Sequence, residues 1–173
     1  MKKNLILTGL LAAMVFLTTA YVMHIPVGVG SGYIHLGDTI IYLAAVLLPT
    51  PYAIAAAAIG GGLADLMSGA AVWMIPTVII KSLMVLPFTA KKERMLCLRN
   101  GLAPIFSGLI GVAGYFVAEI VILCLSGSAF GAAVAGSAVS ILPNGMQEIA
   151  GGVAFLLLAV AMDRLQLKKR LMK

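Results

Sequence analysis

One stretch decides the fold of this chain: residues 34–81, IHLGDTIIYLAAVLLPTPYAIAAAAIGGGLADLMSGAAVWMIPTVIIK. Asp38, Asp65 and Lys81 interrupt a sequence that is otherwise almost entirely apolar. An ionisable side chain inside hydrocarbon is costly, so each such residue marks a candidate functional site. The stretch therefore predicts membrane-embedded helices that carry buried charge.

The composition of the whole chain agrees with this prediction. Its 173 residues are 62% hydrophobic and 10% charged, and the mean hydropathy is +1.10. A soluble domain of this size could not bury so much apolar surface. The apolar runs are long and do not alternate, as expected for membrane helices of about 20 residues rather than for barrel strands of about ten. We predict an all-α integral membrane protein.

The positions of the basic residues predict its orientation. The net charge is +6, and every Lys and Arg except Lys81 falls within residues 2–3, 91–99 or 164–173. Short basic segments beside membrane spans stay on the cytoplasmic side. Both termini and the middle segment are therefore expected on the cytoplasmic side of the membrane. Topology is favoured over nucleic-acid or lipid-headgroup binding as the role of these charges.

Proline, glycine and charge patterns divide the chain into six predicted spans within one transmembrane domain, residues 1–173. The spans are expected at residues 4–23, 37–48, 52–68, 71–89, 102–125 and 143–163. Residues 24–36 combine Pro26 with repeated glycines, which predicts an irregular outer loop, either a connector or a mobile lid. Residues 90–101 form the predicted cytoplasmic loop. The first apolar run, residues 4–23, also has features of a secretory signal. Keeping this run as a membrane span places both termini on the cytoplasmic side, as the charge pattern predicts.

This topology gathers the buried polar residues near the outer side of the membrane. Their spacing places Trp73, Thr77 and Lys81 on one helix face, and it places a second set on another face: Asn144, Gln147 and Glu148. The inner halves of the helices are almost entirely apolar. We predict a solute site that is open to the outside and closed below by an apolar plug. The candidate residues are Tyr33, His35, Asp38, Tyr42, Asp65, Trp73, Thr77, Lys81, Glu119, Asn144, Gln147 and Glu148.

Structural roles remain open for several of these residues. Asp38 could cap its helix, and Asp65 could pair with Lys81. Trp73 could belong to the interfacial aromatic belt, and His35 could be a satisfied interfacial residue. Two other functions also remain open: a stand-alone channel or secondary transporter, and an intramembrane enzyme.

The chain resembles the substrate-binding S components of energy-coupling factor (ECF) vitamin transporters, especially the riboflavin-transporter-like branch. The resemblance extends over nearly the whole length. The matching pieces are Gly37-Asp38, the Gly-x-x-Asp of residues 62–65, Pro76 followed by Lys81, and Pro143-Asn144.

The resemblance implies a six-helix receptor that captures a vitamin-like solute under a lid formed by the loop after the first helix. Such receptors deliver the solute through an EcfT-like transmembrane coupling subunit and two cytoplasmic ATPases. They dock through small residues on the first helix, where this chain has Thr8, Gly9, Ala12 and Ala13. Glycine stands at the first alanine position of that docking pattern.

The sequence itself contains neither a G-x-x-x-x-G-K run nor a hydrolytic motif. We therefore expect no enzymatic activity, no cofactor and no metal in this chain, and ATP hydrolysis only in partner subunits. The candidate site holds several carboxylates against Lys81 alone, which disfavours an anionic solute. A neutral or amine-bearing aromatic heterocycle is expected, of thiamine, pyridoxine, flavin or deazapurine type.

Overall fold

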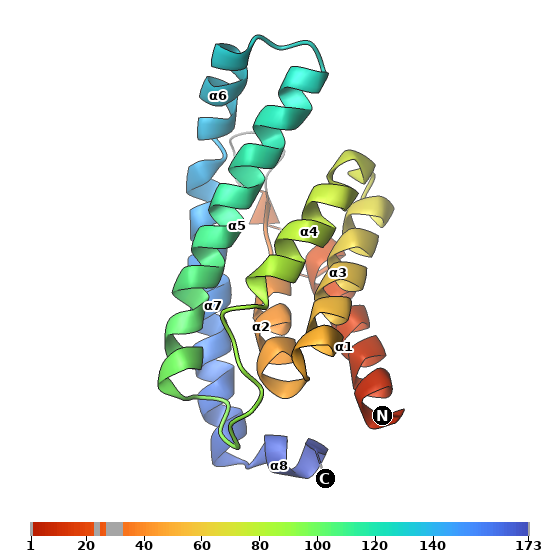
Figure 1. Ribbon diagram of the computed structural model, residues 1–173, viewed down its shortest axis with the longest axis vertical. Coiled ribbons are helices and arrows are strands. Elements are labelled where there is room, and N and C mark those ends of the chain that lie inside the picture. The colour runs from red at the N-terminus through yellow and green to blue at the C-terminus, as the bar shows by residue number, and fades with distance from the viewer. Residues whose placement is uncertain (1, 23–24, 27–32, 173) are drawn as a thin grey trace.

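The computed structural model describes residues 2–22, 25–26 and 33–172, with the backbone alone described at residues 25–26, 33–34 and 172. Nearly all regular structure in this part is helical (Figure 1). The α-helices are α1 (Lys2–Ala20), α2 (Gly37–Leu47), α3 (Thr50–Met67), α4 (Met74–Met84), α5 (Leu98–Leu125), α6 (Phe130–Ala138), α7 (Ile141–Arg164) and α8 (Leu167–Met172). A short 3-10 helix, η1 (Ala71–Trp73), leads into α4.

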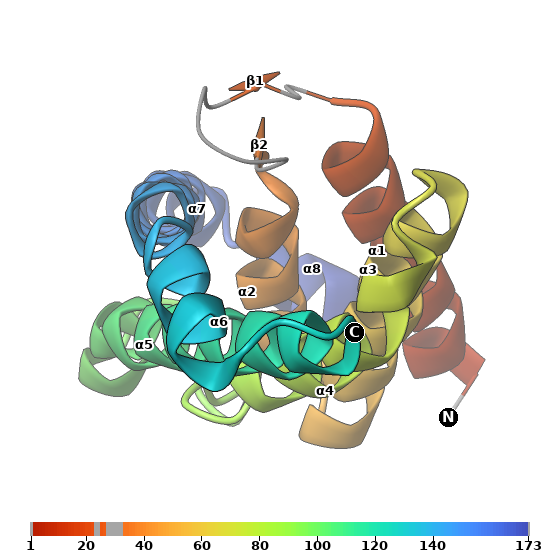
Figure 2. The same cartoon turned by 90° about the horizontal axis from the view of Figure 1, so that it is seen from above.

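Helix α2 is the centre of the bundle. All of its residues are buried, and it lies between α7 on one side and the α1–α3 pair on the other (Figure 2). With 11 residues, α2 is about 16 Å long, which is shorter than a typical hydrocarbon core. A helix that is apolar on all faces is stable when other helices surround it. The neighbouring helices, rather than lipid, therefore cover α2.

Two features of the sequence explain how α1, α2 and α3 pack. Pro49 separates α2 from α3 and occupies the N-cap of α3, and Pro51 is in the first turn of α3. Gly60 of α3 faces α1, where an added Cβ would lie 2.6 Å from the Ala12 carbonyl oxygen and from Val15 Cβ. Glycine is therefore required for the close approach of these two helices.

The predicted outer loop contains a small strand pair at its ends. β1 (Ile25–Pro26) pairs with β2 (Tyr33–Ile34) in antiparallel register, with Ile25 opposite Ile34. Residues 24 and 27–32 lie outside the described part of the chain, and so do the side chains of residues 33 and 34. The choice between a connector and a mobile lid stays a prediction.

The basic segments gather at one end of the molecule. Both termini and the connection between α4 and α5 lie at the same end (Figure 1). The Asp163 carboxylate at the end of α7 accepts hydrogen bonds from the backbone N–H groups of Met95 (2.8 Å) and Leu96 (3.0 Å). Lys168 of α8 donates to the carbonyls of Ala90 (2.8 Å) and Lys92 (2.7 Å). These bonds hold the middle basic segment beside the C-terminal one, in agreement with the charge pattern.

The ends of α4 and α5 differ from the expected ranges for local reasons. Helix α4 ends at Met84, before residue 89, because Pro87 follows and disfavours continued helix. The carbonyls released there find donors: Ser107 Oγ bonds Met84 (2.9 Å), and Arg99 bonds Pro87 (2.7 Å). Helix α5 begins at Leu98 rather than at residue 102.

Three described helical stretches are long and apolar enough to cross a membrane: Lys2–Ala20, Leu98–Leu125 and Phe130–Arg164. Apolar side chains of α5 point outward, as expected for contact with lipid; they include Leu102, Ile105, Phe106 and Leu109. The helices Gly37–Leu47 and Ala71–Met84 are apolar but shorter. The fold is therefore that of a helical membrane protein, and the count of six spans stays a prediction.

Candidate functional site

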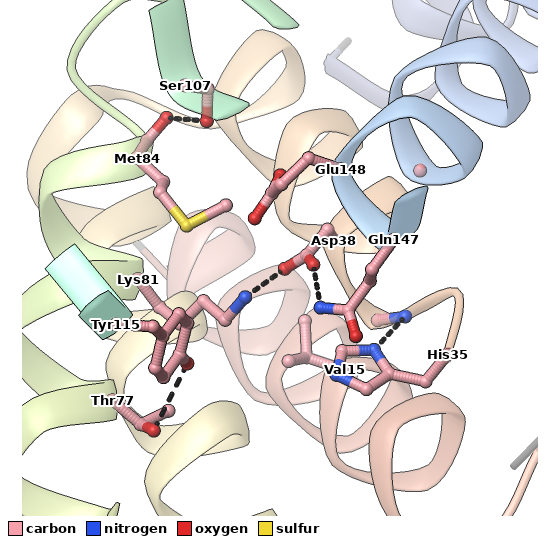
Figure 3. A network of polar contacts seen from close by, with 12 residues as sticks. Val15, His35, Asp38, Thr77, Lys81, Met84, Ser107, Tyr115, Gln147 and Glu148 are labelled. Carbon is pink, nitrogen blue, oxygen red and sulfur yellow. Dashed lines mark hydrogen bonds and ion pairs between the residues drawn. The ribbon is translucent and has the colours of Figure 1, made fainter. Parts of the chain in front are cut away.

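A buried ion pair joins α2 to α4. Lys81 Nζ lies 2.5 Å from Asp38 Oδ1, and the two side chains are 4% and 0% exposed. Gln147 of α7 donates from Nε2 to the second carboxylate oxygen of Asp38 at 2.8 Å. Figure 3 shows the three side chains converging from three helices. A desolvated carboxylate needs such partners, and Asp38 has one for each oxygen.

This arrangement corrects two alternatives from the sequence. Asp38 is in the first turn of α2, but the N-cap is Leu36, and the side chain that accepts a free N–H there is His35, which bonds Gly37. Asp38 is therefore not a helix cap. The direct partner of Lys81 is Asp38 rather than Asp65, because the start of α2 lies inside the bundle, opposite the last turn of α4.

A second buried acid lies beside the ion pair. Tyr42 donates its hydroxyl to Glu148 Oε2 at 2.6 Å, which links α2 to α7. Glu148 rests against two glycines of α5: a Cβ added at Gly108 would lie 3.2 Å from Glu148 Cβ, and one at Gly111 would lie 3.0 Å from Glu148 Cδ. Without side chains at these positions, α5 leaves room for the carboxylate. Sequence reasoning missed both glycines, although their i, i+3 spacing is a weak signal of close packing.

Three aromatic rings fill the space on the side of the termini. Tyr42 stacks on Phe88 with ring centroids 4.9 Å apart, and Phe155 meets both rings edge-on at 5.9 and 5.5 Å. Phe155 lies about two turns beyond Glu148 along α7, and Phe88 follows the end of α4, so both rings are nearer the termini than the ion pair. These rings form an apolar layer beneath the buried acids.

The opposite side of the ion pair has aromatic and hydroxyl groups. The Lys81 ammonium lies 5.2 Å from the ring centroid of Tyr115, within cation–π range. The Tyr115 hydroxyl shares a 3.2 Å hydrogen bond with Thr77, and the rings of Trp73 and Tyr115 are 6.0 Å apart. We call the connected set the polar cluster; it consists of Asp38, Tyr42, Thr77, Lys81, Tyr115, Gln147 and Glu148.

Asp65 lies at the edge of the polar cluster, near the end of α3. It is 8% exposed, the Thr77 hydroxyl lies within hydrogen-bonding range of its carboxylate, and the Lys81 ammonium acts on it at longer range. Among the described residues, no hydrogen-bond partner reaches its Oδ2 atom. A buried carboxylate oxygen without a partner is unusual and requires an explanation.

The other predicted residues have different surroundings. His35 is buried before α2, and its Nδ1 accepts a hydrogen bond from the Gly37 N–H at 3.1 Å. Glu119 and Asn144 are half-buried; each is one helical turn from a member of the polar cluster, Tyr115 and Glu148 respectively. The side chain of Tyr33 lies outside the described residues.

The predicted docking residues divide between two faces of α1. Thr8 and Ala12 are 7% and 5% exposed, so they pack within the chain. Gly9 and Ala13 are exposed on the outer face. A docking surface on this helix is therefore limited to the face that holds Gly9 and Ala13.

A separate polar cavity of about 250 Å³ lies at the end that holds the termini; its lining residues are Glu93, Arg94, Asp163, Gln166, Lys168 and Lys169. Burial lowers the pKa of the Lys168 ammonium, and the charge of Asp163 opposes this shift. Lys168 and Asp163 already bond the α4–α5 connection. The role of this region is therefore to hold that connection against α7 and α8.

The fold and the polar cluster define a helical membrane protein that holds charged groups between its helices. Such residues mark solute or ion sites in membrane proteins. The sequence matches the family described as ECF-type riboflavin transporter, S component, over residues 1–164. This chain belongs to that family, which confirms the resemblance found in the sequence. The family consists of transporter subunits and is not an enzyme family. Comparison with curated proteins finds no match.

Proposed function

We propose that this chain is the receptor of an ECF-type importer and that its polar cluster binds a vitamin-like aromatic heterocycle from outside the cell. The observation that carries the proposal is the position of the Asp38–Lys81 ion pair between two unlike layers. Trp73 and Tyr115 lie on one side of this pair, and the rings of Tyr42, Phe88 and Phe155 lie on the other. A site with stacking surfaces and a few convergent polar groups suits a flat solute.

The proposed orientation places both termini in the cytoplasm of a bacterium. Six segments cross its membrane: α1, α2, α3, η1 with α4, α5, and α7. The shared end of the basic segments supports this orientation. Helices α2 and α4 can be short because they pack against other helices for much of their length. The polar cluster is then accessible from outside, and the aromatic layer closes the cytoplasmic side.

The charges of the site support a solute without net negative charge. Asp38, Asp65 and Glu148 contribute three buried carboxylates, and Lys81 contributes the ammonium that faces them. An anionic solute would add repulsion in a medium that screens charge poorly. A neutral or amine-bearing solute can instead donate N–H groups to these oxygens.

Delivery of the solute requires partners. We propose that an EcfT-like coupling subunit docks on the α1 face with Gly9 and Ala13 and that two ATPases supply the energy. Exposed small residues let a partner helix approach closely. The aromatic layer argues against a stand-alone channel, because it blocks a continuous polar path.

The test is to identify the molecule that the protein retains. The chain is expressed in bacteria grown on rich medium and purified in mild detergent. Bound small molecules are then identified by native mass spectrometry and by chromatography of the denatured sample. We expect one aromatic, nitrogen-containing solute per chain. A protein that retains no solute, and that binds none of thiamine, pyridoxine, riboflavin and deazapurines, would contradict the proposal.

A further inference from the structure

We propose that the solute carries a positively charged nitrogen and that the Asp65 carboxylate is its counter-ion. This inference rests on the proposed function and narrows the solute class from neutral or amine-bearing to cationic. It follows from three observations: the buried carboxyl groups near the Lys81 ammonium, the orphaned oxygen of Asp65, and the position of an aromatic pair nearby.

Three buried carboxyl groups lie near the Lys81 ammonium, and His35 is a further buried titratable group within electrostatic range of Asp38. The Lys81 ammonium is bonded to Asp38 at 2.5 Å, and Gln147 bonds the other oxygen of Asp38. Glu148 accepts a hydrogen bond from the hydroxyl of Tyr42. The partners of Asp38 and Glu148 are thus assigned, whereas Asp65 shares the same ammonium only at longer range. A cation beside Asp65 would give this carboxylate a close counter-charge of its own.

Among the described residues, one oxygen of the Asp65 carboxylate lacks a donor, although the Thr77 hydroxyl lies within hydrogen-bonding range of the group. Its Oδ2 atom is fully buried without a hydrogen-bond partner in the described part of the chain. An unsatisfied buried oxygen costs free energy, and the cost is larger for a charged group. Such a group is expected where a ligand supplies the missing donor. The ammonium or ring N–H of a cationic solute provides a charge-assisted hydrogen bond.

The backbone brings the aromatic pair close to this carboxylate. The Asp65 carbonyl accepts the N–H of Ala70 at 2.9 Å, and the Ala70 carbonyl accepts the N–H of Trp73 at 2.8 Å. Gly69 makes this tight turn possible with φ of 79°. Two successive bonds thus tie the Trp73 backbone to the end of α3, and Tyr115, whose ring packs beside Trp73, lies within electrostatic range of Asp65. Aromatic faces attract cations, so carboxylate and rings favour the same class of solute.

The experiment compares matched solutes that differ in one charged group. The first pair is pyridoxamine and pyridoxine; the second is 7-aminomethyl-7-deazaguanine and 7-cyano-7-deazaguanine. Thiamine and riboflavin serve as a further cation and a further neutral probe. Dissociation constants are measured for the solute-free wild type, for Asp65→Asn, and for Glu93→Gln, a matched change at an exposed acid.

We expect the cationic member of the recognised pair to bind to the wild type at least about tenfold more tightly than the neutral member. The reason is that the cationic member donates a charge-assisted hydrogen bond to the unpartnered oxygen of Asp65. Asp65→Asn should remove most of this preference, because it should weaken binding of the cationic member more than binding of the neutral member. Glu93→Gln should keep the preference. The solute-free Asp65→Asn protein should unfold at a temperature no lower than the wild type.

Two results would overturn the inference and leave the proposed function standing. One is tighter binding of the neutral member, or a retained solute that mass spectrometry shows to be neutral or anionic at pH 7. The other is an Asp65→Asn variant that weakens both members equally and unfolds at a lower temperature, which would make Asp65 a structural residue. Failure to bind any probe, together with no retained solute, would instead reject the proposed function.

Discussion

Lys81 Nζ and Asp38 Oδ1 lie 2.5 Å apart in an interior from which water is almost excluded. The pair fixes the last turn of α4 against the first turn of α2, the central helix of the bundle. Breaking a buried pair from one side leaves a desolvated charge, whereas removing both charges does not. The stability of the bundle therefore depends on the two residues together.

Lys81→Met should lower the free energy of unfolding by about 3–5 kcal/mol, because Asp38 loses its counter-charge. The double variant Asp38→Asn, Lys81→Met should recover most of that loss. Thermal unfolding in detergent measures Lys81→Met, Asp38→Asn and the double variant. Lys169→Met, which breaks an exposed ion pair with Glu93, is the control and should show no measurable loss. A double variant as unstable as the sum of its two single variants would show that the pair is not coupled.

Tyr42→Phe should weaken the bundle by about 1–3 kcal/mol, because Glu148 loses a buried hydrogen-bond donor. The ring remains, so its packing with Phe88 and Phe155 is retained. Thermal unfolding measures the loss. Tyr21→Phe, at an exposed ring, is the matched control. Equal stability of the Tyr42 and Tyr21 variants would mean that the hydroxyl contributes nothing to Glu148.

Gly111→Ala should move the Glu148 carboxylate, because the new Cβ would collide with its oxygen Oε1. We expect weaker solute binding and a lower unfolding temperature. Gly101→Ala on the same helix meets no atom within 4 Å. It should be neutral or stabilising, because alanine favours a helix over glycine by up to about 1 kcal/mol. A destabilised Gly101→Ala variant together with an unaffected Gly111→Ala variant would contradict this packing.

Asp163→Ala should loosen the α4–α5 connection, because the N–H groups of Met95 and Leu96 lose their shared acceptor. Trypsin should then cut after Lys91, Lys92 or Arg94 faster than in the wild type. In sealed vesicles, cleavage should occur only when the cytoplasmic side faces the protease. Cleavage from the outside would contradict the proposed orientation.

The sequence was sufficient for the features that depend on periodicity and on the cost of buried charge. The i, i+4 spacing of Trp73, Thr77 and Lys81 predicted a shared face, and the structure joins these residues through Tyr115. The run of apolar residues after Asp38 predicted an element buried in a nonpolar environment. These features follow from local geometry, which the sequence records directly.

Pairings between helices could not be predicted in the same way. Lys81 had two acidic candidates, and its choice of Asp38 depends on how α2 sits among α1, α3, α4 and α7. The space that Gly108 and Gly111 leave for Glu148 likewise arises only when α5 meets α7. The end of α4 at Met84 reflects Pro87 together with donors from α5. Each of these features requires the three-dimensional arrangement.

The most direct test of the central claim is the affinity of the retained solute for wild type and for Glu148→Gln, with Glu93→Gln as the control. Glu148 is buried in the polar cluster, and Glu93 is exposed on the face that holds the termini. A solute bound in the cluster should lose at least about tenfold in affinity when the carboxylate becomes an amide. Unchanged affinity in both variants would contradict the assignment of the site.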